Sequence, residues 1–189
     1  SFGVGYGRAL YENFSVGGHL KRAFQYLGNN VVPVSDSSNT VENNVANAIA
    51  VDFGTIYITD WHGFTFGMSV RNFSEEVEYG YDSFQLPLTF RIGGSIDVLS
   101  FLPSLSEKQS LRMALEALHP RSYPERLNFG LEYSFMDLGN LRLGYLFNYD
   151  ERNLTYGAGI KLGPLKIDYA LTPFGVFDSV SRISVSIAR

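Results

Sequence analysis

Strict alternation of apolar and polar residues is the feature that most constrains how this chain folds, and it is clearest between Leu141 and Leu171. Because successive side chains of a β-strand point to opposite faces, this period predicts three consecutive strands. Each has one apolar face and one face rich in glycine and charge. The apolar positions are Leu141, Leu143, Tyr145 and Phe147, then Leu154, Tyr156, Ala158, Ile160 and Leu162, then Leu165, Ile167, Tyr169 and Leu171.

The same period recurs along almost the whole chain and predicts about eleven strands. The 15 Phe, 12 Tyr and 19 Gly fit a chain rich in strands and turns. Ser104–His119 also contains good helix formers, but the alternation from Ser110 to Leu118 and the neighbouring strands favour a strand. The predicted strands are residues 2–7, 14–26, 48–59, 64–71, 86–97, 110–118, 127–135, 141–147, 154–162, 165–171 and 181–187.

A period of two does not say which face is wet. In a soluble sandwich or lipocalin-like barrel, the apolar face is the core. In a membrane barrel it meets lipid. Two features favour the membrane barrel: the apolar face is broad, and the other face carries many glycines and few Lys or Glu, unlike a typical exposed strand face.

Aromatic residues also gather at strand ends, as in the interfacial girdles of membrane barrels. We therefore predict an all-β fold, an antiparallel up-and-down transmembrane β-barrel, with residues 1–189 in a single domain. Leu143, Tyr145, Ile160, Ile167 and Tyr169 are expected to face lipid. The aromatic residues at strand ends are Tyr11, Phe14, Trp61, Phe64 and Phe135 near short turns, and Tyr26, Phe73 and Phe84 near long loops.

The odd strand count has a consequence for closure, since bacterial single-chain barrels have even numbers of strands. We expect that the chain does not close a barrel by itself and that an odd number of N-terminal strands is absent. The strands Phe2–Gly7 and Ser181–Ile187 are then expected to be the two edges.

Charged residues on the polar face are expected to point into the barrel interior. They form either a polar conduit or ligand surface, or cross-strand ion pairs that fill a wet interior, and the ion-pair interpretation is favoured. The principal positions are Arg71, Arg91, Glu116, Glu132, Arg142, Lys161, Lys166 and Asp168, and the same face also carries Lys21, Asp52, Asp97, Arg112 and Arg182.

No catalytic, metal or cofactor site is predicted. The chain has no Cys, and its three His residues are scattered without convergent ligands. No Ser lies in a nucleophile motif, so we expect that the protein is not an enzyme. A net charge of −4 without a basic run argues against nucleic acid as a partner.

Two runs carry a resemblance to a known family: "HPRSYPERLNFGLEYSF" and "LRLGYLFNYDERNLTYGAGIKLGPLKIDYAL". They resemble the C-terminal part of the PorV/PorQ family. The resemblance implies a bacterial outer-membrane barrel with the fold of FadL fatty-acid transporters, of about fourteen strands. It also implies a role in type IX secretion in Gram-negative bacteria, with outer-membrane lipid and a cargo or secretion protein as partners.

The long segment Gly28–Val45 is the predicted partner-binding loop, because loops on a rigid scaffold are the usual place for binding. Its "VVPV" run is β-prone and suits pairing with an extended peptide. A protein-binding scaffold is thus the first functional hypothesis, a conduit for hydrophobic small molecules the second, and a soluble β-protein the third. The residues singled out in the loop are Val31, Val32, Pro33, Val34 and Asp36.

Overall fold

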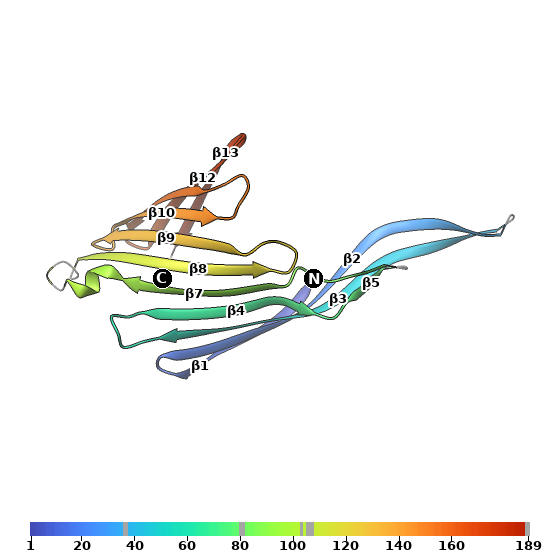
Figure 1. Ribbon diagram of the computed structural model, residues 1–189, viewed down its shortest axis with the longest axis horizontal. Helices are drawn as coiled ribbons and strands as arrows, with labels where there is room; N and C mark the ends of the chain where they lie inside the picture. The colour runs from blue at the N-terminus through green and yellow to red at the C-terminus, as the bar shows by residue number, and fades with distance from the viewer. Residues whose placement is uncertain (36–37, 80–81, 103, 105–107, 188–189) are drawn as a thin grey trace. The chain divides into compact units, whose positions relative to one another are not determined.

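The computed structural model describes residues 1–35, 38–79, 82–102, 104 and 108–187 and has an all-β fold (Figure 1). Eleven antiparallel strands form one sheet, as the alternation predicts, in the order β1-β2-β3-β4-β7-β8-β9-β10-β11-β12-β13. Two further strands, β5 and β6, form a small sheet of their own. The large sheet is not closed, because β1 and β13 are its two ends, as expected.

The strands of the large sheet are β1 (Phe2–Tyr11), β2 (Phe14–Ser35), β3 (Ser38–Ile58), β4 (Thr65–Ser74), β7 (Thr89–Asp97), β8 (Gln109–Pro120), β9 (Arg126–Phe135), β10 (Gly139–Phe147), β11 (Leu154–Leu162), β12 (Leu165–Phe174) and β13 (Phe177–Ile187). The small sheet consists of β5 (Val77–Tyr79) and β6 (Asp82–Phe84), and a 3-10 helix, η1, covers Val98–Phe101. Within the described residues, no helix combines the length and apolar character needed to cross a membrane.

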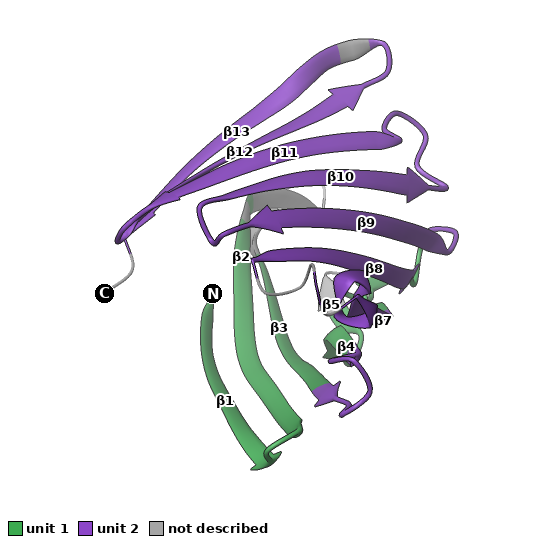
Figure 2. Ribbon diagram, turned by 90° about the vertical axis from the view of Figure 1, so that its left-hand side faces the viewer, with its two compact units in different colours: residues 1–55, 69–90, 120–122 green, residues 56–68, 91–119, 123–189 purple. Residues whose placement is uncertain are grey.

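The chain divides into two compact units, which Figure 2 colours separately. Unit 1 comprises Ser1–Thr55, Ser69–Phe90 and Pro120–Ser122. Unit 2 comprises Ile56–Met68, Arg91–His119 and Tyr123–Arg189.

In unit 2, strands β8 to β13 follow one another as hairpins with regular register. The turn between β9 and β10 shows why the hairpins are tight. Met136 and Asp137 both have positive φ, of 51° and 54°, and Leu138 N donates to Phe135 O at 2.9 Å. Two central residues with positive φ match the right-handed twist of the flanking strands.

The segment Ser110–Leu118, with its good helix formers, lies in a strand, as predicted. It is the main part of β8, which pairs with β9 in a register that places Leu111 opposite Tyr133 and Leu115 opposite Phe129. Cross-strand packing of alternate side chains therefore outweighs the local helix propensity.

In unit 1, the prediction of an irregular loop over Gly28–Val45 is wrong. Strand β2 continues to Ser35 and β3 begins at Ser38, so both form a long hairpin (Figure 1). Strand β1 covers β2 only as far as Arg22, which leaves an edge where Pro33 is tolerated. Val31, Val32, Pro33 and Val34 belong to β2, and Asp36 lies outside the described residues.

The segment Ser74–Gln85 lies between two predicted strands, 64–71 and 86–97, and contains the β5–β6 hairpin, which was not predicted. Val77 of this hairpin is buried with Ala46 and Ala48 of β3, and Leu86 packs against the cluster. The small alanine side chains alternate along β3 and let the hairpin approach. Sequence patterning missed the hairpin because its strands are only three residues long.

Candidate functional site

The apolar face of unit 2 is exposed. Leu141, Ile160 and Ile183 are 63%, 47% and 73% exposed. Register aligns Leu141, Ala158, Tyr169 and Ile183 in one row across β10 to β13, and Ile160 lies two residues along β11 from Ala158. Contiguous apolar surface of this kind marks a membrane or protein contact. Other large apolar side chains exposed on this face are Ile92, Met113, Leu115, Tyr133, Phe135, Leu143, Tyr145, Phe147, Leu154, Tyr156, Leu162, Tyr169, Val185 and Ile187.

The opposite face of unit 2 carries a row of residues that register aligns across six strands. In order from β8 to β13, the row is Arg112, Glu132, Arg142, Gly157, Ala170 and Arg182. Its first three positions alternate in charge, whereas the next two have almost no side chain. Oppositely charged side chains directly across two strands attract each other.

Arg142 is the centre of an ionic network on this face. Its Nε donates to Glu132 Oε2 at 2.6 Å, and its Nη1 donates to Asp168 Oδ1 at 2.7 Å. Lys166 Nζ lies 3.3 Å from the second oxygen of Asp168. All four side chains were predicted to share the interior face, and the structure brings them together as two cations and two carboxylates.

Gly159 makes room for this network. It lies opposite Asp168 in β12 and opposite Asn140 in β10. A Cβ atom on Gly159 would lie 2.5 Å from Asp168 Oδ1 and 2.6 Å from Asn140 Oδ1. The glycine therefore leaves space for polar side chains from both neighbours.

A second, smaller cluster joins two further predicted residues. Arg91 Nη1 lies 3.6 Å from Glu116 Oε1, and Asn128 Nδ2 donates to Glu116 Oε2 at 3.1 Å. Arg71 and Lys161, by contrast, make no side-chain hydrogen bond or ion pair with any described residue. Lys161 lies directly opposite Lys166.

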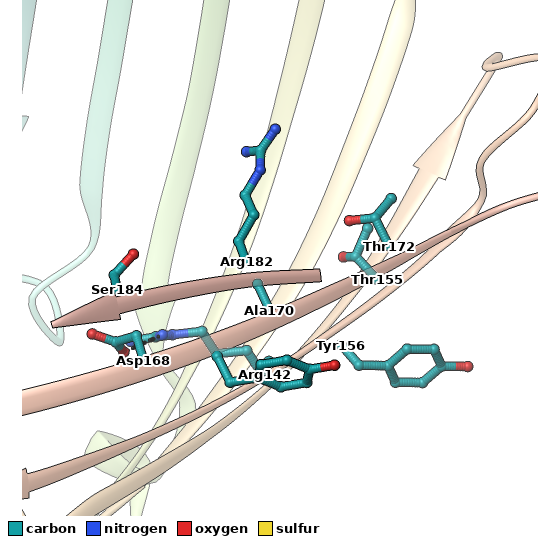
Figure 3. A pocket seen from close by; sticks show the side chains of 10 residues that line it. Arg142, Thr155, Tyr156, Asp168, Ala170, Thr172, Arg182 and Ser184 are labelled. Atoms are coloured by element: carbon teal, nitrogen blue, oxygen red, sulfur yellow. Dashed lines mark hydrogen bonds and ion pairs between the residues drawn. The ribbon is translucent and has the colours of Figure 1, made fainter. Parts of the chain in front are cut away.

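A cavity of about 370 Å³ lies beside the network in unit 2 (Figure 3). Arg142, Asp168 and Arg182 contribute its charged lining, and three hydroxyl side chains contribute further polar lining. The hydroxyl side chains are those of Thr155, Thr172 and Ser184, and the rest of the lining consists of Tyr156, Gly157, Tyr169 and Ala170.

Unit 1 contains a polar cluster whose key residue, Asn72, the sequence did not reveal. Lys21 Nζ donates to both oxygens of Asp52 at 2.8 Å and to Asn72 Oδ1 at 2.5 Å. The backbone N of Asn72 donates to Asp52 Oδ1 at 2.7 Å, and its Nδ2 donates to Pro87 O at 3.0 Å. Asn72 has a φ of 61°, which Asn adopts more readily than most residues. It therefore ties the base of the β5–β6 segment to β2 and β3.

The histidines form no metal site, since the described residues contain no group of three ligating side chains suited to a metal ion. His119 Nδ1 lies 3.1 Å from Glu125 Oε1. The pKa of the Glu125 carboxyl lies below its usual value because a backbone hydrogen bond within its own residue and the nearby His119 both favour the charged form. Both side chains are well exposed, which fits a strand-end pair.

Aromatic side chains gather at the short connection between β3 and β4, where the sequence predicted an interfacial girdle. The Trp61 ring lies 5.8 Å from Phe101 and 6.3 Å from Phe64. His62 stacks on Phe101 with a centroid distance of 3.9 Å.

Neither a protein-family model nor a curated protein sequence matches this chain.

Proposed function

We propose that this chain is part of an outer-membrane β-barrel of the PorV/PorQ type that acts as a protein-binding scaffold in a type IX-like secretion or surface-attachment system. The observation that carries the proposal is the pairing of an exposed apolar face with an ionic face on the same strands. Membrane barrels have this arrangement, with apolar residues toward lipid and polar residues toward a wet interior.

The strand dimensions support this proposal. Strands β8 to β13 contain 9 to 12 residues each, and a tilted strand needs about 9–11 residues to cross the hydrocarbon core. The aromatic cluster around Trp61 suits the headgroup region, where aromatic rings are enriched.

The open edges of the sheet also bear on the proposal. Unpaired backbone groups are too costly in hydrocarbon, at several kcal/mol each. If the sheet lies in a membrane, further strands must therefore cover β1 and β13. An odd number of such strands allows closure with every pair antiparallel.

The ionic face favours a scaffold over the alternative of a conduit for hydrophobic molecules. Arg142, Asp168 and Arg182 line the cavity together with Tyr156, Tyr169 and Ala170, and a hydrophobic ligand bound there would remove water from the three charged groups, which is costly. The exposure of the apolar face weighs against the other alternative, a soluble β-protein with that face as its core.

Membrane fractionation tests the location. The chain should sediment with outer membranes, resist extraction by salt and carbonate, and be released by detergent. Recovery of monodisperse chain in the soluble fraction without detergent would contradict the proposal.

Shortening the β2–β3 hairpin tests the scaffold role. Deletion of residues 30–44 removes the far end of this hairpin, beyond the last β1–β2 pair at Arg22. It should leave the rest of the sheet folded and should reduce capture of secretion partners. A matched variant, Arg142→Ala, changes the interior face and should leave capture intact. If capture were lost only in Arg142→Ala, the result would contradict the scaffold hypothesis and favour the conduit hypothesis.

A further inference from the structure

Arg182 is a cation at the end of a charge-matched row. Within unit 2, Glu132 and Arg142 lie opposite each other and form an ion pair. On the same face, Arg91 forms an ion pair with Glu116. Arg182 lies opposite Ala170, and no described carboxylate forms an ion pair or hydrogen bond with it. No counter-charge therefore lies directly opposite Arg182, and the carboxylate two residues along β12, Asp168, is ion-paired with Arg142 and Lys166.

The strand that carries Arg182 is also an edge of the sheet. Strand β13 pairs with β12 along one side, from the Leu165–Ile187 pair to the Phe174–Phe177 pair, and no other described strand pairs with its second side. Its unpaired side presents a row of backbone N–H and C=O groups that forms a template for another strand.

This edge carries two charged residues, Asp178 and Arg182, which oppose the addition of an unmatched strand, but it lacks the other features that usually block strand addition. Strand β13 is 11 residues long and contains no Pro, and its one irregular pairing lies beside the turn, between Thr172 and Phe174. The face opposite Arg182 presents Ile183, Val185 and Ile187, which are exposed. A long, regular and apolar edge favours addition of a further strand.

We propose that the free edge of β13 binds an antiparallel acidic strand: an extended segment with Asp or Glu directly opposite Arg182 and apolar residues opposite Ile183 and Val185. The acidic residue continues the cross-strand charge matching on the ionic face, and the apolar residues continue the apolar face. Main-chain hydrogen bonds supply affinity and the opposed side chains supply specificity. The inference deepens the proposed function and rests on it in that a barrel requires a strand at this edge.

The experiment uses the full chain in detergent micelles and two fluorescent peptides with blocked ends. Both are nine-residue segments that alternate serine and valine, and they differ only at the central serine position, which is aspartate in one and lysine in the other. Fluorescence anisotropy at low salt measures binding of each peptide. The aspartate peptide should bind about tenfold more tightly, because attraction in one peptide is replaced by repulsion in the other.

Charge reversal identifies the residue responsible. Arg182→Glu should reverse the preference, and Arg182→Lys should keep it. Lys161→Glu is the matched control, because Lys161 is a cation of the same face without a described partner but lies in β11, away from the edge. This control should leave the preference unchanged, and circular dichroism establishes that each variant retains its sheet.

Three results would overturn the inference: equal affinity for both peptides, no binding of either, or a preference that Arg182→Glu leaves intact. If the chain self-associates and Arg182→Glu abolishes that self-association, the strand bound at the edge is a second copy of the chain. That result would also overturn the inference. Failure of the proposed function gives a different result. If the chain fractionates as soluble but Arg182→Glu still reverses the peptide preference, the membrane location is contradicted and the peptide-binding edge is supported.

Discussion

Arg142 Nε lies 2.6 Å from Glu132 Oε2 across a directly opposed pair of residues on β10 and β9. The same guanidinium also binds Asp168. We expect Arg142→Ala to lower the free energy of unfolding by about 1 kcal/mol, since these side chains are partly exposed and such pairs are individually weak. Denaturant titration of the folded protein measures the change.

A double-mutant cycle separates the ion pair from general effects of the substitutions. Arg142→Ala and Glu132→Gln together should cost less than the sum of the two single changes, because the residues share one interaction. The coupling should shrink as salt rises from 0.01 M, where screening extends over about 30 Å, to 1 M. Strict additivity at low salt would mean that the pair contributes nothing to stability.

Two glycines on the ionic face, Gly93 and Gly130, should respond in opposite ways to an added methyl group. A Cβ atom on Gly93 would lie 2.8 Å from Leu115 O, whereas a Cβ atom on Gly130 would meet nothing within 4 Å. Gly93→Ala should therefore destabilise the fold by about 1–3 kcal/mol through overpacking. Gly130→Ala should stabilise it by about 0.4–1 kcal/mol through reduced freedom of the unfolded chain.

Thermal or denaturant unfolding of the two variants, each compared with the parent chain, tests this contrast. Equal loss of stability in both would show that glycine at these positions serves backbone curvature and not the close approach of a neighbouring strand.

Asn72 has two roles that substitutions can separate. Asn72→Ala removes the bonds to Lys21 Nζ and Pro87 O and places an alanine at a φ of 61°. We expect a cost of about 2 kcal/mol from the lost hydrogen bonds and the left-handed backbone. Asn72→Gly loses the same bonds without the backbone strain and should cost about half as much. Protease cleavage within the β5–β6 hairpin should be fastest in Asn72→Ala, slower in Asn72→Gly and slowest in the parent chain.

If Asn72→Ala and Asn72→Gly lower the free energy of unfolding equally, the left-handed backbone contributes nothing. The lost hydrogen bonds would then account for the whole effect. Replacement of Arg71, the adjacent residue without a described partner, by Ala is the matched control. It should change the free energy of unfolding by less than about 0.5 kcal/mol.

Alternation predicts the sheet well because period 2 is a direct consequence of strand geometry. It also places Glu132, Arg142, Lys166 and Asp168 on one face, where the structure joins them. Their pairing depends on register, which turns set. The register between β9 and β10 rests on positive φ at Met136 and Asp137. Asp is common in such turns, but Met is not, so the sequence signal for this turn is weak.

The remaining features were not accessible from the sequence. Asn72 interrupts the alternation of β4 and makes contacts over 20 and 51 positions in sequence with Asp52 and Lys21. The β2–β3 extension was hidden because its Asn and Ser residues are typical of loops. Pairing with a neighbouring strand outweighs that local preference, as it does for the helix formers of β8.

Leu143 tests which environment the apolar face meets. It lies at the middle of β10, between Leu131 of β9 and Tyr156 of β11, and is 44% exposed. In a bilayer, Leu143→Arg near the midplane should cost about 2–4 kcal/mol. Folding into lipid vesicles, followed by denaturant titration, measures this cost.

Ala114→Arg is the matched control on the ionic face, where its neighbour Gly130 leaves space, and should cost much less. If Leu143→Arg were neutral and Ala114→Arg severe, the apolar face would not meet lipid, and the membrane location proposed for this chain would be wrong.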